Sequence, residues 1–553
     1  MRMKALGLNA ITTYVAWNCH EVEEMKYERL DEVTQFLDIA HEEGMLVNLR
    51  LGPYMCAEWD LGGLPTYLLT KSNIKLRTFN ADYITAVDRW WNTLLPKLVP
   101  YLYSAGGPIV LAQVENEYGS FGNVAENPDD AHYMDHLLKR LQNYFGDDVV
   151  YTTVDAASLL PRGTPWKNDT RVLATIDGGL SSTGYDDGFA QQKAFNAEGH
   201  FAKMWSELYT GWLTHWGEVA VNKTAKETFD GLKAMVESGG SFSLYMAHGG
   251  TNFGFWSGAN SQGEANYAPD LTSYDYNAPI SEAGDHNIGK DGGDLFAAVA
   301  SALATNSGNR APEPAPIKKR AYGVVKLSSS VALFEALFEG LPSCKRNLSS
   351  KERFPSMESL GMKSGLVLYH GYGPYNEFAL DFTYTNLHDR VQVFADEVEV
   401  GTAYRSQCPT TVQVPHGYNI DLLVENMGHI NYGQGIYDWK GLNMTPPDPS
   451  EITWFAYCFD LNIKRIQGLT WHDIYPQHGP IFYRAVFNID GTPADTFVDT
   501  RGLTKGYLWV NGYNLGRFWE AEGPQHTLYV PATFLHEGEN EVIILDLHGA
   551  QVD

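Results

Sequence analysis

The sequence has few of the residues that build a metal centre or a disulfide framework. Its 553 residues include five cysteines, Cys19, Cys56, Cys344, Cys408 and Cys458, and no two of them form a C-x-x-C pair. The 17 histidines include no H-E-x-x-H motif. The sequence therefore predicts neither a zinc site nor a thioredoxin-type redox site, and the odd number of cysteines leaves at least one thiol free. No metal or other cofactor is expected.

Basic residues and long apolar runs are also scarce. The 40 Lys and Arg stand against 67 Asp and Glu, a formal net charge of −27, which argues against nucleic acid or an anionic membrane as the main partner. No apolar run has the length of a transmembrane helix, so no membrane span is expected. The apolar stretch at the N-terminus is too short for a signal peptide. It is typical of a helix that ends near Gly7 and leads into a strand, and we expect an N-terminally truncated chain.

The composition is that of an ordinary globular protein that is rich in aromatic rings. Hydrophobic residues make up 44% and charged residues 19% of the chain, and the length favours two to four domains. Aromatic residues reach 13%, with 14 Trp and 32 Tyr. Such rings stack on the apolar faces of sugars, but they also fill β-sandwich cores, so the excess alone leaves both interpretations open.

Up to residue 305 the sequence alternates strand-like and helix-like segments. Apolar runs that predict strands cover 10–17, 45–51, 109–116, 149–154, 172–176, 203–209 and 241–247, and helical spacing covers 31–43, 83–98, 133–144 and 229–236. Such alternation favours a parallel sheet, and over this length a (β/α)8 TIM barrel is its natural closure. Seven strands are visible, so we expect the barrel of residues 1–305 to lack its first strand, which would precede Met1.

The pattern changes after a proline-rich segment that holds Pro312, Pro314 and Pro316. We interpret residues 306–360 as a linker and connecting segment. Short alternating strands follow, and hairpin turns are predicted at Asp396-Glu397 and at Asn511-Gly512. The sequence thus predicts two jelly-roll-like β-sandwich domains, 361–450 and 451–553, with a structural role.

Two glutamates follow apolar runs at predicted strand ends. Glu117 lies in QVENEYG, residues 113–119, and Glu207 lies in MWSELYTGW, residues 204–212. Counted with the missing strand, they end strands four and seven, and active sites of such barrels lie at the C-terminal strand ends. Two carboxylates with aromatic neighbours are what hydrolysis of a glycosidic bond needs. An isolated glutamate there is more often a solvated or capping residue, and Glu115, on the same strand face as Glu117, is expected to be structural.

These motifs together resemble glycoside hydrolase family 35, the β-galactosidases, and in the tail its animal lysosomal branch. The resemblance covers nearly the whole chain. Beside the two glutamate motifs it is carried by residues 3–11 (MKALGLNAI), 14–21 (YVAWNCHE), 52–59 (GPYMCAEW), 62–65 (GGLP), 249–254 (GGTNFG), 272–279 (TSYDYNAP), 421–428 (DLLVENMG) and 509–517 (WVNGYNLGR). What it implies is an exo-enzyme that removes terminal non-reducing β-D-galactose from glycans, glycoproteins or glycolipids by retaining double displacement.

The resemblance also implies roles for single residues. Glu117 would be the acid/base and Glu207 the nucleophile, with Asn116 donating to the sugar 2-hydroxyl and Tyr209 orienting the nucleophile. The galactose contacts would be Tyr14, Ala57 through its backbone, Glu58 and Tyr276, with Trp212 as a stacking wall. From the residues alone, Tyr14 and Trp212 could instead pack in the barrel and Glu58 could cap a loop. Tyr274 is the alternative to Tyr276.

Location and the competing functions rest on the same resemblance. It implies a lysosomal or secreted protein, in which the sequons at Asn168, Asn222, Asn347 and Asn443 would be glycan sites. A homo-oligomer is compatible with the sequence. One alternative is a retaining hydrolase of another β-glycoside. A second is a non-catalytic glycan-binding protein, which would be expected to have lost one of the two glutamates, and both are present.

Overall fold

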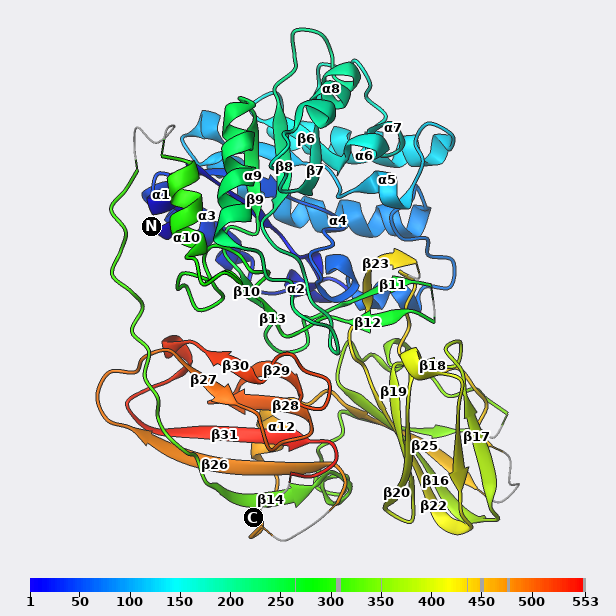
Figure 1. The fold of residues 1–553 in the computed structure, drawn as a ribbon. Helices are drawn as coiled ribbons and strands as arrows, with labels where there is room; N and C mark the ends of the chain where they lie inside the picture. Colours follow the sequence, from blue (N-terminus) through cyan, green and yellow to red (C-terminus); the bar gives the residue numbers. More distant parts are fainter. Residues whose placement is uncertain are drawn as a thin grey trace.

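The computed structural model describes residues 1–263, 265–304, 310–349, 351–434, 436–447, 452–474 and 478–550. A barrel-like α/β unit forms the N-terminal part, and two β-sandwiches lie next to each other below it in Figure 1. The fold class predicted from the sequence, an incomplete parallel barrel followed by all-β domains, is therefore confirmed.

The barrel is built on one sheet of seven parallel strands. In sheet order these are β1 (Ala10–Tyr14), β4 (Leu46–Arg50), β5 (Ile109–Gln113), β6 (Val150–Ala156), β7 (Val172–Gly179), β8 (Met204–Tyr209) and β9 (Ser241–Tyr245). All seven predicted strands are present. The two outer strands, β1 and β9, are joined by a hydrogen bond from Ser243 Oγ to Thr12 Oγ1 of 3.0 Å, which brings the ends of the sheet together.

Helices pack around this sheet. They are α1 (Arg2–Leu6), α3 (Leu30–Glu42), α4 (Ala81–Leu98), α6 (Pro128–Phe145), α8 (Asp186–Phe195), α9 (Ala225–Glu237) and α10 (Leu295–Ala302), with short turns α2 (Trp17–His20), α5 (Tyr118–Phe121) and α7 (Leu160–Gly163). Helix α4 shows why they form: Asn80 caps its first turn, and Trp90 and Trp91 are buried. Helix α1 ends at Gly7, whose φ of 99° is the left-handed C-cap that the sequence predicts. Within the described ranges no helix has the length and hydropathy to span a bilayer.

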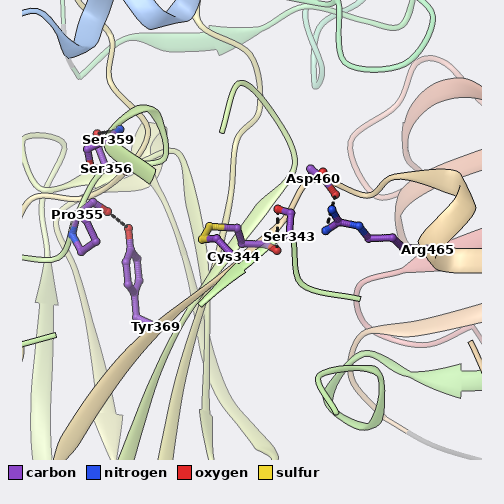
Figure 2. Close-up of a disulfide and its surroundings, with 9 residues drawn as sticks. Ser343, Cys344, Pro355, Ser356, Ser359, Tyr369, Asp460 and Arg465 are labelled. Atoms are coloured by element: carbon purple, nitrogen blue, oxygen red, sulfur yellow. Dashed lines mark hydrogen bonds and ion pairs between the residues drawn. A yellow bond between two sulfur atoms is a disulfide. The ribbon is translucent and has the colours of Figure 1, made fainter. Parts of the chain in front are cut away.

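The first sandwich has a six-stranded sheet. Its order is β15 (Cys344–Leu348), β25 (Thr453–Phe459), β16 (Leu366–Tyr375), β22 (Gly417–Glu425), β19 (Arg390–Ala395) and β20 (Val398–Tyr404), and β17 (Phe378–Phe382) pairs with β21 (Thr410–Val414). Strand β15 lies within the expected linker of 306–360, and β25 lies beyond the expected boundary at 450. Cys344 and Cys458 face each other across this pair and form a disulfide, shown in Figure 2.

The second sandwich combines a five-stranded sheet with a two-stranded one. The larger sheet has the order β14 (Leu327–Ala332), β26 (Ile481–Ile489), β31 (Gly538–Asp546), β28 (Lys505–Val510) and β29 (Tyr513–Trp519), and β27 (Thr496–Asp499) pairs with β30 (Thr527–Val530). Strand β14 also comes from the expected linker. Both predicted hairpin turns are present: all four central residues have φ between 47° and 86°, as a type I′ turn requires.

One small sheet at the mouth of the barrel has strands from both the barrel and the first sandwich. The barrel hairpin of β11 (Ala259–Gln262) and β12 (Tyr267–Pro269) is extended by β23 (Ile430–Gln434), which follows the main strands of the first sandwich. The other small pairs are β2 (Glu21–Glu23) with β3 (Lys26–Tyr27), β10 (Gly250–Thr251) with β13 (Ser273–Tyr274), and β18 (Leu387–His388) with β24 (Gly441–Leu442). The barrel mouth is thus built from both parts of the chain.

Candidate active site

A cavity of about 470 Å³ opens at the C-terminal ends of the barrel strands. All nine residues that the sequence nominates line it: Tyr14, Ala57, Glu58, Asn116, Glu117, Glu207, Tyr209, Trp212 and Tyr276. They come from the ends of different strands and from the loops that follow. These nine residues, up to 262 positions apart in the chain, therefore meet in one concave site.

The two catalytic candidates reach the cavity in different ways. Glu207 is part of β8 and is 4% exposed. Glu117 lies beyond β5, which ends at Gln113 and not at residue 116 as the sequence suggests. Its φ of 43° turns the chain from the strand into α5, while its N–H donates to the carbonyl of Val154 at 3.1 Å. A non-glycine residue in this left-handed region is uncommon and points to a functional constraint.

Glu115 has the structural role expected of it, although not for the expected reason. It lies beyond the end of β5 and has a positive φ of 59°, so it does not share a strand face with Glu117. Its carboxylate is fully buried and accepts two hydrogen bonds from Arg77, at 2.9 and 2.8 Å, and one from Tyr133 at 3.0 Å. A buried charge needs such a partner, and this pair fixes the backbone just before Glu117.

Arg50 is the site residue that sequence reasoning missed. It ends β4, is 1% exposed, and donates to Glu207, to Asn116 Oδ1 and, at 2.8 Å, to the hydroxyl of Tyr14. Asn116 in turn donates to Glu117 Oε2 at 3.2 Å. A continuous chain of contacts, Glu207–Arg50–Asn116–Glu117, therefore joins the two carboxylates. The only signal was a single charged residue at the end of the apolar run 45–51.

The electrostatics of the cavity keep one carboxyl group protonated. Burial, and then the negative charge of Glu207, raise the pKa of Glu117 to about 8. Burial also raises the pKa of Glu58 to about 7, against the lowering effect of its hydrogen bond from Tyr274. For Arg50, burial lowers the pKa, but Glu207 and neighbouring tyrosines outweigh it and the net shift is upward. Glu117 is thus a proton donor at neutral pH, beside a paired Glu207.

The loop after β4 presents Glu58 and the backbone of Ala57 to the cavity. Cys56, Ala57 and Glu58 all have positive φ, between 50° and 63°. This unusual run turns the main chain toward the site. Glu58 is held from behind by the hydroxyl of Tyr274, whereas Tyr276 lines the cavity itself. Of the two tyrosines weighed as a galactose contact, Tyr276 thus lines the cavity and Tyr274 does not, and the contact itself stays a prediction.

Aromatic rings form one side of the cavity. The Tyr209 ring packs edge-on against Trp212 and Tyr245, with centroids 5.2 and 6.0 Å apart, and Trp212 is 45% exposed. Within the described residues no hydrogen bond joins Tyr209 to Glu207; Arg50 is the donor instead. A role of Tyr209 in orienting Glu207 stays a prediction.

Several lining residues carried no sequence signal. Tyr245 ends β9, and Tyr432 comes from β23, far along the chain in the first sandwich. The outer part of the cavity is lined by polar side chains, namely His215, Glu218, Gln262 and Asn266. Their positions depend on how loops pack against each other, which residue patterns do not encode.

Comparison with known proteins agrees with this geometry. The family model of glycosyl hydrolases family 35 matches residues 1–290, that of the first all-β domain of β-galactosidase matches 355–447, and that of the β-galactosidase galactose-binding domain matches 480–540. The chain is 38% identical to "Beta-galactosidase 8" of Oryza sativa subsp. japonica, covering 99% of this chain and 87% of the relative. It is also 38% identical to the proteins named "Beta-galactosidase" of Bos taurus and Homo sapiens, covering 100% of this chain and 85% and 82% of theirs. The chain therefore belongs to glycosyl hydrolases family 35.

Proposed function

We propose that the protein is a retaining exo-β-galactosidase that removes terminal β-linked galactose. The observation that carries this proposal is the arrangement of Glu117 and Glu207, which line one cavity and are joined through Arg50 and Asn116. The names of the relatives support galactose as the sugar. Family membership and intact carboxylates favour this function over a non-catalytic glycan-binding protein.

In the first step Glu207 attacks the anomeric carbon and the bond from that carbon to the leaving oxygen breaks. Glu117, protonated because its pKa is about 8, gives its proton to that oxygen. The result is a galactosyl ester on Glu207 and a free alcohol. In the second step Glu117, now ionised, takes a proton from water while the water oxygen attacks the same carbon and the bond from that carbon to Glu207 breaks. Galactose leaves, and both carboxyl groups return to their starting states.

The remaining residues position the sugar. Arg50 holds the Glu207 carboxylate in place, and Asn116 lies between the two carboxylates, where its amide can reach a 2-hydroxyl. Tyr14, Glu58 and Tyr276 form the inner part of the cavity, and Glu58 and Tyr276 are 6% and 5% exposed. Because this inner part is closed by buried side chains, it accepts the end of a glycan and not its middle.

The experiment that tests the proposal compares the wild-type chain with Glu207→Gln on aryl β-galactosides, β-glucosides and β-glucosaminides. We expect the wild type to turn over the galactoside fastest and Glu207→Gln to lose at least about 10⁴-fold in kcat, since the covalent step is removed. Glu198→Gln, an exposed surface change, is the matched control. Full activity of Glu207→Gln, or a faster glucoside, would contradict the proposal.

We also propose that the protein works in the lysosome or outside the cell. The disulfide between Cys344 and Cys458 suits an oxidising compartment, and the asparagines of all four sequons, Asn168, Asn222, Asn347 and Asn443, are exposed. Enzymatic deglycosylation of the protein from its native source tests this, because a mobility shift is expected only after passage through the secretory pathway. A homo-oligomer stays a prediction.

A further inference from the structure

The outer part of the cavity differs from the inner part in exposure and chemistry. Inside, Glu58, Glu207 and Tyr276 are all less than 9% exposed, whereas at the mouth Trp212 is 45% exposed and the Glu218 side chain 53%. If the inner part holds the terminal galactose, as the proposed function requires, the leaving group lies at the mouth. The residues there determine which leaving groups the enzyme accepts.

The mouth offers hydrogen bonds and aromatic faces. The carboxamides of Gln262 and Asn266 line it, and each amide both donates and accepts. The rings of Trp212 and Tyr432 provide apolar surfaces from the barrel and from the first sandwich. Carboxamides beside exposed rings suit a hydroxylated ring with apolar faces, which is the chemistry of another sugar unit.

Glu218 places a fixed negative charge at this mouth. Its Oε2 accepts hydrogen bonds from the backbone N–H of His215 at 3.1 Å and pairs with the His215 ring at 2.8 Å. The ring lies 3.3 Å from Asp270 on its other side. Among the described residues, Glu218 Oε1 has no hydrogen-bond partner. The carboxylate is therefore held in one place with one oxygen free.

The loop that carries Glu218 is itself anchored. Trp216 N–H donates to the carbonyl of Pro269 at 3.0 Å, and Gly217 N–H donates to the carbonyl of Gly523 in the second sandwich at 3.0 Å. These contacts tie the loop to the β11–β12 hairpin side of the mouth and to the second sandwich. Because the loop is anchored, the distance between the Glu218 carboxylate and a bound leaving group is fixed.

Among the described residues that line the cavity, the one basic side chain is His215, and two carboxylates, Glu218 and Asp270, share its ring. None of the described lining residues is lysine or arginine. Arg50 and Lys223 touch site residues from behind: Arg50 pairs with Glu207, and Lys223 lies 3.5 Å from the carbonyl oxygen of Tyr209. An anionic leaving group would thus approach Glu218 with no lysine or arginine in the described lining to offset the repulsion.

We infer that the mouth is a subsite for a neutral sugar as leaving group, and that Glu218 discriminates against leaving groups that carry a negative charge. This inference rests on the proposed function. It makes Glu218 a specificity-determining residue that acts by repulsion, with no part in bond breaking.

The test uses two disaccharides with the same linkage, galactosyl-β-1,4-glucose and galactosyl-β-1,4-glucuronic acid, so that they differ by one carboxylate. We expect the wild type to favour the neutral one in kcat/KM by about tenfold at low salt, and less at high salt, as for a screened charge–charge term. Glu218→Gln should reduce the preference to within about threefold, and Glu218→Lys should erase or reverse it. The preference is read as the ratio of the two kcat/KM values of each variant, so that any general change in activity of Glu218→Gln, whose carboxamide still accepts from His215, cancels.

The control is Glu198→Gln, which removes the same charge from a surface site outside the cavity and should leave the preference unchanged. An equal preference in wild type and Glu218→Gln would overturn the inference. So would failure to cleave both disaccharides by a wild type that still cleaves an aryl β-galactoside. Loss of activity on the aryl substrate as well would instead overturn the proposed function.

Discussion

Glu117 and Glu207 are the same residue type with opposite tasks, and their surroundings separate them. Glu207 is paired with Arg50, whereas Glu117 has a neutral amide donor, Asn116, and a negative neighbour. Burial and that neighbour raise the pKa of Glu117 to about 8. The Glu117 carboxyl group is thus protonated below about pH 8 and loses its proton as the pH rises through that value.

For natural-type substrates we therefore expect kcat/KM to fall above about pH 8, because the leaving oxygen then receives no proton. Glu117→Gln should abolish this limb. It should also lose far more activity on a galactoside with a poor leaving group than on a dinitrophenyl galactoside, whose dinitrophenolate leaves without a proton. Rates for both substrate types from pH 4 to 10 check this. Equal losses on both would contradict the acid role.

Arg50 gives a second prediction at this scale. A lysine in its place keeps one charge but loses the fork that reaches Glu207, Asn116 and Tyr14 together. We expect Arg50→Lys to lower kcat by at least about tenfold with a smaller effect on KM, since the misplaced nucleophile affects the transition state most. Arg390→Lys, at a buried arginine paired with Glu425 in the first sandwich, should destabilise the chain but keep the kcat of the folded enzyme. Equal kcat for wild type and Arg50→Lys would contradict a positioning role.

The residue scale also shows how far sequence reasoning reaches. Glu117, Glu207 and Glu58 stand in distinctive motifs, so they could be nominated from the sequence. Arg50 could not, because it closes an apolar run that reads as buried strand. Tyr432 could not either, because nothing local says that β23 of a sandwich extends a barrel hairpin.

At the scale of elements, periodic patterns predicted the barrel strands and the main helices well. The sandwich boundaries were harder. Strands β14 and β15 lie in a region of prolines and charges that reads as linker, and β25 lies past the proposed boundary at 450. Their assignment depends on antiparallel partners up to 158 positions away, such as Leu327 with Ala485. Non-local pairing of this kind leaves no local signal.

The disulfide between β15 and β25 allows a prediction about these elements. It closes a loop with a sequence separation of 114, for which the loss of chain entropy in the unfolded state stabilises the fold by about 2–5 kcal/mol. The double variant Cys344→Ala with Cys458→Ala should unfold at a lower temperature in calorimetry. Its activity at 25 °C should stay within about twofold, because neither residue lines the cavity. Cys408→Ala, at a free cysteine, is the control, and an equal loss of stability there would contradict the prediction.

At the scale of the whole molecule, buried charges hold the three parts together. Glu425 of the first sandwich accepts a hydrogen bond from Lys505 of the second. Burial raises the pKa of Glu425, but the charges of Lys505, Arg390 and Arg517 outweigh it and lower the pKa to about 2. Between barrel and first sandwich the link is His429, whose ring lies 2.8 Å from Asp60 and 2.9 Å from Glu358. Both links fix the sandwiches that contribute to the cavity mouth.

His429 connects this architecture to the active site. Asp60 follows Glu58 by two residues, and β23, which carries Tyr432 into the cavity, begins directly after His429. Burial lowers the pKa of His429, but Asp60 and Glu358 outweigh it and raise the value to about 10. The imidazole is therefore a buried cation in the folded protein at neutral pH, whereas in the unfolded chain it titrates near ~6.5.

A group whose pKa is higher in the folded state than in the unfolded state stabilises the fold. This stabilisation is complete below the pKa of the unfolded state and is lost as the pH rises to the pKa of the folded state. The stability from His429 should thus be complete below pH ~6.5 and decline from there to about pH 10. His429→Gln should cost about 3–5 kcal/mol at pH 6, because it leaves two buried carboxylates without their cation, and should flatten this decline. Unfolding temperatures of wild type, His429→Gln and the exposed control His536→Gln from pH 5 to 10 test it. Parallel curves for wild type and His429→Gln would show that the charge of His429 does not hold the domains together, and an unchanged KM would show that β23 stays in place without it.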